Sequence, residues 1–170
     1  MSVALLSHTP EHLRLLFDGG AGYEAQTGIA LAEGAAEFFG GPDVSESFEA
    51  RVRVADKTDP WRDGFGVLHV DENRVIGLAT FNGPPDRDAA VEISYAIAPD
   101  YVGRGYATAA ARLLIAYAKE SGHVNSVRAR TLPEENASSR ILRKCGFQMK
   151  GEMTDPEDGL IWQWELRLRS

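Results

Sequence analysis

The sequence predicts one α/β (α+β) domain, in which a mixed and mostly antiparallel sheet of about seven strands carries helices on both faces. Apolar and polar residues alternate along several short segments in the second half of the chain, which is typical of half-buried strands. An alanine-rich segment with apolar residues at helical spacing separates two of these strands. It predicts a central β-α-β crossover with parallel strands and a right-handed connection. The length of 170 residues is ordinary for one domain.

The first sixty residues are expected to supply one strand and several helices. Thr9 followed by Pro10 indicates a helix start, because threonine caps helices and proline suits the first helical position. Asp43 and Glu46 resemble a capping box in front of a run with helical spacing. The predicted elements are a strand Val3–Ser7, a helix His12–Phe17, one or two short helices within residues 21–41, and a helix from Val44 to Ala55.

The remaining residues are expected to build most of the sheet. Asp71, Glu72 and Asn73 separate two apolar segments as a hairpin turn does, and Gly122 and Gly146 follow two helical patterns. The predicted strands are Phe65–Val70, Arg74–Phe81, Val91–Ala98, Ser126–Leu132, Phe147–Met153 and Leu160–Leu168, and the predicted helices are Gly105–Ser121 and Asn136–Cys145. The three middle strands should form an antiparallel meander.

Composition narrows the classes of function. The 18 basic and 25 acidic residues give a formal net charge of −7, which argues against general nucleic-acid binding. Cys145 is the only cysteine and the four histidines lack metal-ligand spacing, so we expect neither a disulfide framework nor a metal site. The apolar run from Val3 to Leu6 is too short for a signal peptide, and no run approaches the length of a membrane span. We therefore expect a cytoplasmic protein without a membrane partner.

The most informative stretch runs from Asp100 to Thr108, between a predicted strand and a predicted helix. Unpaired backbone N–H groups and the positive end of the helix dipole meet at such a junction and favour an anion. Gly103 and Gly105 let the backbone approach a ligand closely, and Arg104 adds positive charge. The stretch lacks the Gly-Lys-Ser/Thr of a P-loop and the third small residue of a dinucleotide fingerprint, which argues against ATP and NAD.

Three segments carry a resemblance to a known family: the strand Val91–Pro99, the loop Val102–Ala107, and Pro133–Phe147. They resemble the GNAT superfamily of N-acetyltransferases, most closely the branch that includes ribosomal-protein N-terminal acetyltransferases. Two positions depart from its pattern, since Val102 stands where Gln or Arg is usual and Asn136 lies one residue closer to Gly146. The alternative role of Asn136 is the N-cap of its helix. The resemblance implies contacts with acetyl-coenzyme A from Tyr95, Ala96, Ile97, Val102, Gly103, Arg104, Gly105, Tyr106, Ala107, Thr108, Asn136 and Ser139.

The resemblance also implies that an amine attacks the thioester carbonyl directly in a ternary complex. Glu92 is the candidate general base, through a water, because it is the carboxylate on the strand that leads into the loop. The alternative is an ordinary solvated or salt-bridged carboxylate. If the family's bulge is present, this strand separates from Ser126–Leu132 and opens a cleft. Leu142 stands where many family members have the tyrosine that protonates the thiolate. Ser138 and Ser139 are the candidate substitutes, and their alternative is to be ordinary serines of the first helical turn. Cys145 is expected to be a core residue.

Three functions remain open at this point. The first is an acetyl-coenzyme-A-dependent N-acetyltransferase whose partner is a primary amine, either a peptide or protein N-terminus or a small molecule. The second is a coenzyme-A-binding sensor or scaffold with little transfer, and the third is a different nucleotide-binding domain. A homodimer is one option. The expected division of the chain places the acceptor-side helices in residues 1–60 and the cofactor-binding sheet in residues 61–170.

Overall fold

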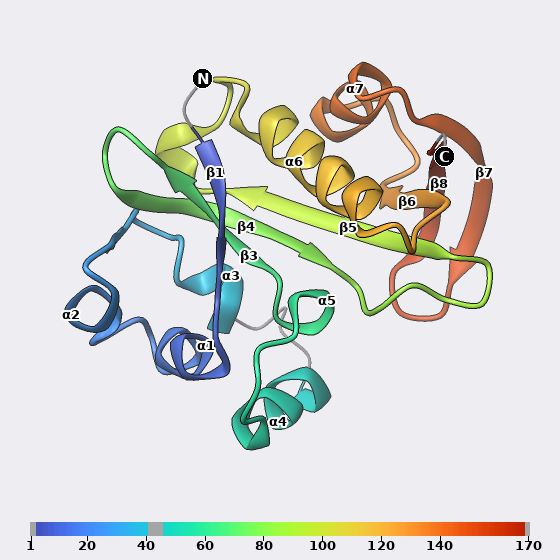
Figure 1. Cartoon of the computed structure of the whole chain (residues 1–170). Helices are drawn as coiled ribbons and strands as arrows, with labels where there is room; N and C mark the ends of the chain where they lie inside the picture. Colours follow the sequence, from blue (N-terminus) through green and yellow to red (C-terminus); the bar gives the residue numbers. More distant parts are fainter. Residues whose placement is uncertain (1–2, 41–45, 169–170) are drawn as a thin grey trace.

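The computed structural model describes residues 3–40 and 46–168 and shows a central sheet between two groups of helices (Figure 1). In chain order the elements are β1 (Val3–Ser7), α1 (Pro10–Phe17), α2 (Tyr23–Thr27), β2 (Ala30–Leu31), α3 (Glu37–Gly40), α4 (Glu46–Val54), α5 (Pro60–Asp63), β3 (Phe65–His69), β4 (Arg74–Phe81), β5 (Ala90–Ile97), a 3-10 helix (Pro99–Tyr101), α6 (Tyr106–Ser121), β6 (Ser126–Thr131), α7 (Ala137–Lys144), β7 (Gln148–Asp155) and β8 (Gly159–Arg167). No helix within these described ranges is long and apolar enough to cross a membrane.

The sheet has the order β1-β3-β4-β5-β6-β8-β7, and β2 pairs with β4 from outside this path. The pairs β3–β4 and β4–β5 are antiparallel and β5–β6 is parallel, which confirms the predicted meander and the predicted parallel crossover. The sequence pattern missed β2, because a strand of two residues is too short to alternate.

The helix boundaries follow the capping residues. The Thr9 side chain accepts a hydrogen bond from the His12 N–H, and Pro10 opens α1 as predicted. The predicted short helices are α2 and α3. The capping box at Asp43 lies outside the described residues. The sequence analysis missed α5, although its start follows the same rule, because the Asp59 side chain caps a helix that begins with proline.

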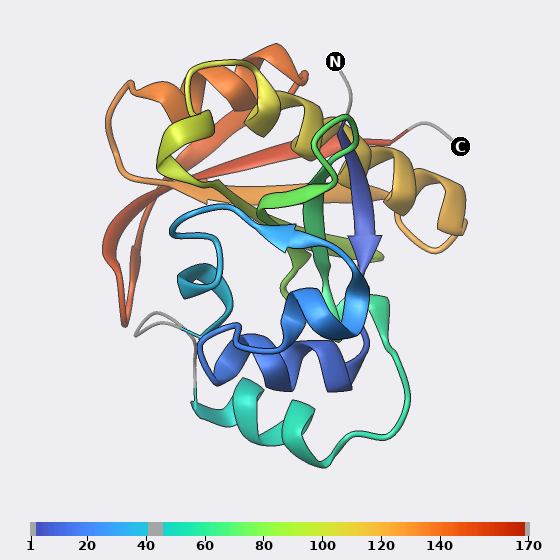
Figure 2. The same cartoon turned by 90° about the vertical axis from the view of Figure 1, so that its left-hand side faces the viewer.

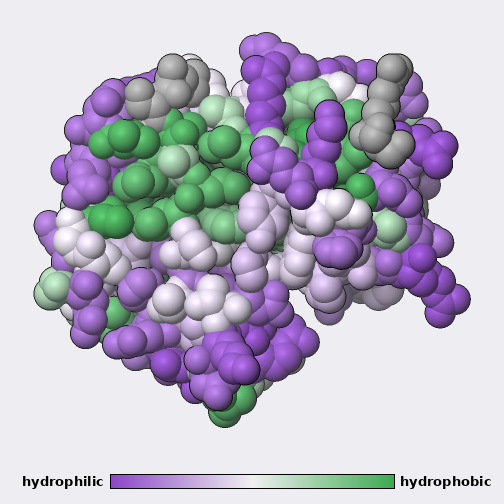
Figure 3. Space-filling view, in the orientation of Figure 1, coloured by the Kyte–Doolittle hydropathy of each residue, from purple (hydrophilic) through white to green (hydrophobic). Residues whose placement is uncertain are grey.

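Strand β4 separates two apolar clusters because its side chains point to opposite faces of the sheet. Val75 and Leu78 pack against the cluster that α1 and α4 build, whereas Ile76 and Ala79 face α6 and α7. Ile76 is an extra residue in the pairing with β3, and this bulge lets Val75 and Leu78 share one face. Helices therefore cover both faces of the sheet, as predicted (Figure 2). Hydrophobic residues on the outer surface gather over β1 and the β3–β4 hairpin (Figure 3).

Strands β5 and β6 separate in the middle of the sheet. Their pairing includes Glu92↔Arg128 and goes no further along the described strands, although β5 continues to Ile97. Pairing between β4 and β5 keeps one register from Phe81↔Ile93 to Gly77↔Ile97. The expected opening is therefore present, but the bulge that accompanies it lies in β4, at Ile76, rather than in β5.

Gly77 fixes the distance between β4 and β5 opposite Ile97, in the part of β5 that has already left β6. A Cβ atom at Gly77 would lie 2.2 Å from the Ala96 carbonyl oxygen and 3.0 Å from the Ile97 side chain. We expect Gly77→Ala to lower the free energy of unfolding by about 2–4 kcal/mol in urea titrations, because a rigid backbone has to move. The control is Gly28→Ala, which adds a methyl group in open space at a φ of +74° and should cost about 1 kcal/mol. An equal cost for the two variants would contradict the proposed contact.

Candidate active site

A slot of about 290 Å³ lies where β5 and β6 separate. Side chains from both faces of the sheet line it, because residues that alternate along β5 point to opposite sides. Glu92 and Ser94 lie on the face of α1 and α4, and Tyr95 lies on the face of α6 and α7. Ser138 and Leu142 of α7 complete the second side. The slot therefore passes through the sheet rather than into it.

Backbone groups of β5 point into this slot. The Asn82 N–H donates to the Glu92 carbonyl and the Ala98 N–H donates to the Ile76 carbonyl, so the even-numbered residues of β5 bond with β4. The odd-numbered residues of β5 then direct their N–H groups toward β6. The last parallel pair, Glu92↔Arg128, uses the N–H of Ile93, so the N–H groups of Tyr95 and Ile97 lie beyond the point where pairing stops. Of the three residues predicted from the family, Tyr95 and Ile97 present an N–H to the slot, and Ala96 does not.

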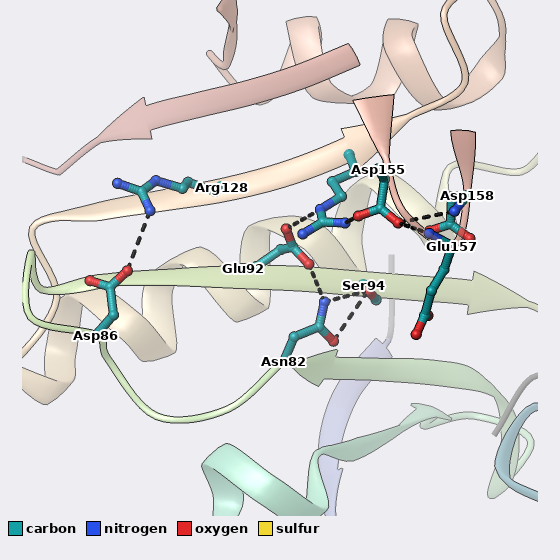
Figure 4. Close-up of polar contacts among 9 residues, drawn as sticks. Asn82, Asp86, Glu92, Ser94, Arg128, Asp155, Glu157 and Asp158 are labelled. Atoms are coloured by element: carbon teal, nitrogen blue, oxygen red, sulfur yellow. Dashed lines mark hydrogen bonds and ion pairs between the residues drawn. The ribbon is translucent and has the colours of Figure 1, made fainter. Parts of the chain in front are cut away.

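The Glu92 carboxylate lies at the mouth of the slot and is held on two sides (Figure 4). It accepts hydrogen bonds from Arg130 Nε at 2.8 Å and from Asn82 Nδ2 at 2.6 Å. Arg130 also pairs with Asp155 in the β7–β8 turn. Backbone N–H groups of Asp158 and Glu157, together with Arg130, lower the pKa of the Asp155 carboxyl, so this anchor stays ionised. The salt-bridged alternative for Glu92 thus describes its geometry, and no local sequence pattern indicates partners so far apart in the chain.

The glycine loop leads directly into α6. Gly103 and Gly105 have φ values of +76° and +87°, in the left-handed region that favours glycine. Gly105 is the N-cap and supplies no side-chain hydrogen bond, so the N–H groups of the first turn remain available to an anion. A cavity of about 440 Å³ adjoins this turn and is lined by Thr108, Arg112 and Lys144 among others. The two cations favour a polyphosphate, and the sequence analysis had not singled them out.

Side chains of the β3–β4 hairpin form hydrogen bonds with this loop. The Tyr101 hydroxyl donates to Glu72 at 2.5 Å, and Tyr106 bonds with His69 Nε2 at 3.1 Å. The Glu72 N–H donates to His69 Nδ1, which joins the two contacts. The hydrogen bond from Tyr101 lowers the pKa of the Glu72 carboxyl, so this contact is charged at neutral pH. Arg104 lies over the Tyr101 ring, 5.6 Å from its centroid. These hydrogen bonds therefore hold the predicted loop residues, Val102 to Thr108, against the β3–β4 hairpin.

The residues at the start of α7 have different contacts. Asn136 is the N-cap of a complete capping box, which confirms the alternative role considered for it. Ser139 is fully buried, and its hydroxyl is bonded to Glu135 and to the Asn136 backbone. Ser138 is exposed on the first turn and lines the slot together with Glu92. Of these three, Ser138 is the one whose side chain lines the slot.

Tyr95 is a second group that could protonate a thiolate, and sequence reasoning had considered only its backbone. Its side chain lies beside α7 and lines the slot with Leu142. Burial raises the pKa of the Tyr95 phenol above its usual value, so the hydroxyl remains protonated at neutral pH and can donate. Burial also raises the pKa of the Cys145 thiol, which fits the expected core role rather than a nucleophile.

A larger cavity of about 660 Å³ lies on the same face of the sheet as Glu92. Leu78, Thr80 and Asn82 stand opposite Ala96, Ser94 and Glu92 in the β4–β5 ladder, so the side chains of the six residues share one face. Asn82 lines both this cavity and the slot. A molecule held in the larger cavity thus meets the slot at Asn82 and Glu92.

The geometry has a known counterpart. The profile of the Acetyltransferase (GNAT) domain matches residues 25–148. The chain belongs to the GNAT acetyltransferase family. The uncharacterized N-acetyltransferase p20 of Bacillus licheniformis is 30% identical over 116 residues, which are 68% of this chain and 65% of that protein. The [ribosomal protein uS5]-alanine N-acetyltransferase of Escherichia coli K12 is 28% identical over 92 residues, 54% of this chain and 47% of that protein. The chain matches about half to two thirds of the length of these curated relatives.

Solved structures show the same GNAT fold. A ribosomal L7/L12 alpha-N-protein acetyltransferase in complex with coenzyme A superposes with a TM-score of 0.66 at 14% identity, covering 99% of this chain and 95% of the other. A spermidine N-acetyltransferase chimera from Vibrio cholerae and a second source gives a TM-score of 0.67 at 15% identity, covering 98% and 96%. At these identities the likeness concerns the fold alone, so the acceptor has to be inferred from this chain's own residues.

In this GNAT chain the helices beside the larger cavity rest on a buried histidine. His8 is 1% exposed, its Nε2 bonds with the Tyr23 hydroxyl at 2.7 Å, and its ring lies 5.3 Å from that of Phe39. Within the described chain its Nδ1 has no hydrogen-bond partner. Burial, with a smaller contribution from His12, lowers the pKa of His8 from 6.5 to about 4.

The buried His8 predicts a loss of stability on mild acidification. The unfolded chain takes up a proton near pH 6.5 and the folded chain does so only near pH 4, so stability falls as the pH drops through this window. Between pH 7 and pH 5 the contribution is about 2 kcal/mol. We expect His8→Gln to lose about that much less than the wild type over this interval, measured by urea unfolding at both values. Equal losses in the two proteins would contradict the neutral, buried His8.

Proposed function

We propose that the chain is an acetyl-coenzyme-A-dependent N-acetyltransferase that moves an acetyl group to a primary amine. The observation that carries the proposal is the slot between β5 and β6, which is lined by α7 on one face of the sheet and adjoins a separate cavity at Asn82 on the other. An enzyme that brings two substrates together directly needs such a passage. The names of the Escherichia coli relative and of the spermidine enzyme support an amine acceptor.

The chain's own residues would divide the work as follows. The N–H groups from Val102 to Thr108, with Arg104, would bind the pyrophosphate. The N–H groups of Tyr95 and Ile97 would hold the pantetheine arm and polarise the thioester carbonyl. Glu92, oriented by Asn82 and Arg130, would take the amine proton through a water. When the tetrahedral intermediate collapses, the C–S bond breaks and the coenzyme A thiolate takes a proton from Tyr95 or Ser138.

A second function is kept open by Leu142 in place of the family's tyrosine and by the ion pair that holds Glu92. Both features would suit a coenzyme-A-binding sensor or scaffold. Release of free thiol from acetyl-coenzyme A in the presence of an amine separates the two functions, since only a transferase produces it. Saturable acetyl-coenzyme A binding without thiol release would favour the scaffold. A cytoplasmic location, a homodimer and the division into residues 1–60 and 61–170 remain predictions.

Glu92→Gln removes the proposed base and keeps the shape of the side chain. We expect kcat to fall about a hundred-fold or more while the dissociation constant of acetyl-coenzyme A, measured by calorimetry, stays unchanged. The control is Glu165→Gln on β8, which removes a carboxylate paired with Arg128 on the same face. An unchanged kcat in Glu92→Gln would remove this residue from the mechanism.

The two candidate acids can be ranked by matched hydroxyl deletions. We expect Tyr95→Phe to lower kcat at least ten-fold, because the buried phenol is the protonated donor beside the slot, and Ser138→Ala to lower it less than three-fold, by about the worth of a weak hydrogen bond. Steady-state thiol release measures both, with calorimetry as the check on coenzyme binding. The reverse ranking would assign the proton to Ser138.

A further inference from the structure

The walls of the larger cavity are mainly apolar. Its volume of about 660 Å³ falls in the range of sites for small ligands. Six aliphatic and aromatic side chains from the helices and from β4 line it. They are Leu13, Phe38, Phe39, Phe48, Leu78 and Phe81. Such walls favour an acceptor with an apolar body next to the reacting amine.

The carboxylate in this cavity is already neutralised. Asp63 is the one acidic residue among the described lining residues, and its side chain is fully buried. Arg62 donates to both of its oxygens, at 2.6 and 3.0 Å, and the Asp59 N–H donates at 2.9 Å. Taking Asp63 away from Arg62 to serve a cationic ligand would leave a buried charge unpaired, which is costly.

One cation in the cavity remains available. Arg51 projects from α4, is exposed, and forms no ion pair or hydrogen bond with any residue of the described chain. Its neighbour Arg53 is different, because Asp18 and Glu49 hold it. At the other end of the cavity Asn82 leads to Glu92, which shares Arg130 with Asp155. Among the charged residues that line the cavity, Arg62 and Asp63 offset each other and Arg51 has no partner in the described chain, so the lining carries an excess of positive charge.

This balance of charge distinguishes between classes of amine. A polyamine would have to bring two or more ammonium groups into apolar walls without a free carboxylate to receive them. Resting on the transferase function proposed above, we propose that the acceptor is an amine on an apolar body that also carries a carboxylate, and that this carboxylate binds Arg51. The amine enters at Asn82 and Glu92, and the apolar body lies along the phenylalanines. Both an apolar amino acid and a peptide with an apolar first residue and an acidic second one have this chemistry.

Calorimetry on the protein saturated with coenzyme A tests the inference without turnover. The ligands are L-phenylalanine, L-phenylalaninamide, the dipeptide amides Phe-Asp-NH₂ and Phe-Asn-NH₂, and spermidine. We expect at least one carboxylate ligand to bind about ten-fold tighter than its amide counterpart, as a charge-assisted contact implies. A preference for L-phenylalanine indicates an amino acid, and a preference for Phe-Asp-NH₂ indicates a peptide. Arg51→Gln should abolish the preference, and Arg167→Gln, at the end of β8, should retain it.

Two results would overturn this inference and leave the transferase intact. They are tighter binding of spermidine than of every carboxylate ligand, and a carboxylate preference that is absent or that survives Arg51→Gln. The transferase itself is tested separately by thiol release with the same ligands. Arg51-dependent binding without any thiol release would support the ligand class and overturn the transferase.

Discussion

The end of pairing between β5 and β6 after Glu92↔Arg128 governs the rest of the site. A strand that leaves its neighbour exposes N–H and C=O groups that the fold does not satisfy, and buried backbone groups need partners. In this chain the exposed groups lie on one edge of β5, close to the loop that leads into α6. The opening therefore leaves backbone groups of β5 that a ligand can satisfy by hydrogen bonds. The N–H groups at the start of α6, which can bind a phosphate, follow β5 directly in the chain. Gly77 keeps β4 close enough to hold β5 in this position.

The sequence analysis recovered the features that depend on neighbours along the chain. Alternation marked the long strands, Thr9 and Pro10 marked the start of α1, and two glycines marked the anion loop. The features it missed depend on contacts between distant segments. No local pattern links Arg130 to Asp155, or places Arg51 in a cavity with Asn82. The proposed role of the Tyr95 side chain was missed because no local pattern places its ring in the slot beside α7.

The departure at Asn136 also has a physical explanation in the structure. With its side chain and Ser139 committed to the capping box, α7 begins in a fixed position over the slot. Ser138 lines the slot from the first turn of α7, and Leu142, which is apolar and buried, lines it one turn later. In the proposed transferase the proton for the leaving thiolate would therefore come from β5 or from the start of α7.

A passage that crosses the sheet has two mouths, and they lie on different sides of the molecule. One opens beside α7, and the other opens at Asn82 beside the larger cavity. In the proposed transferase each substrate would reach the slot from its own side of the sheet. Such an arrangement would let either substrate arrive first and either product depart first.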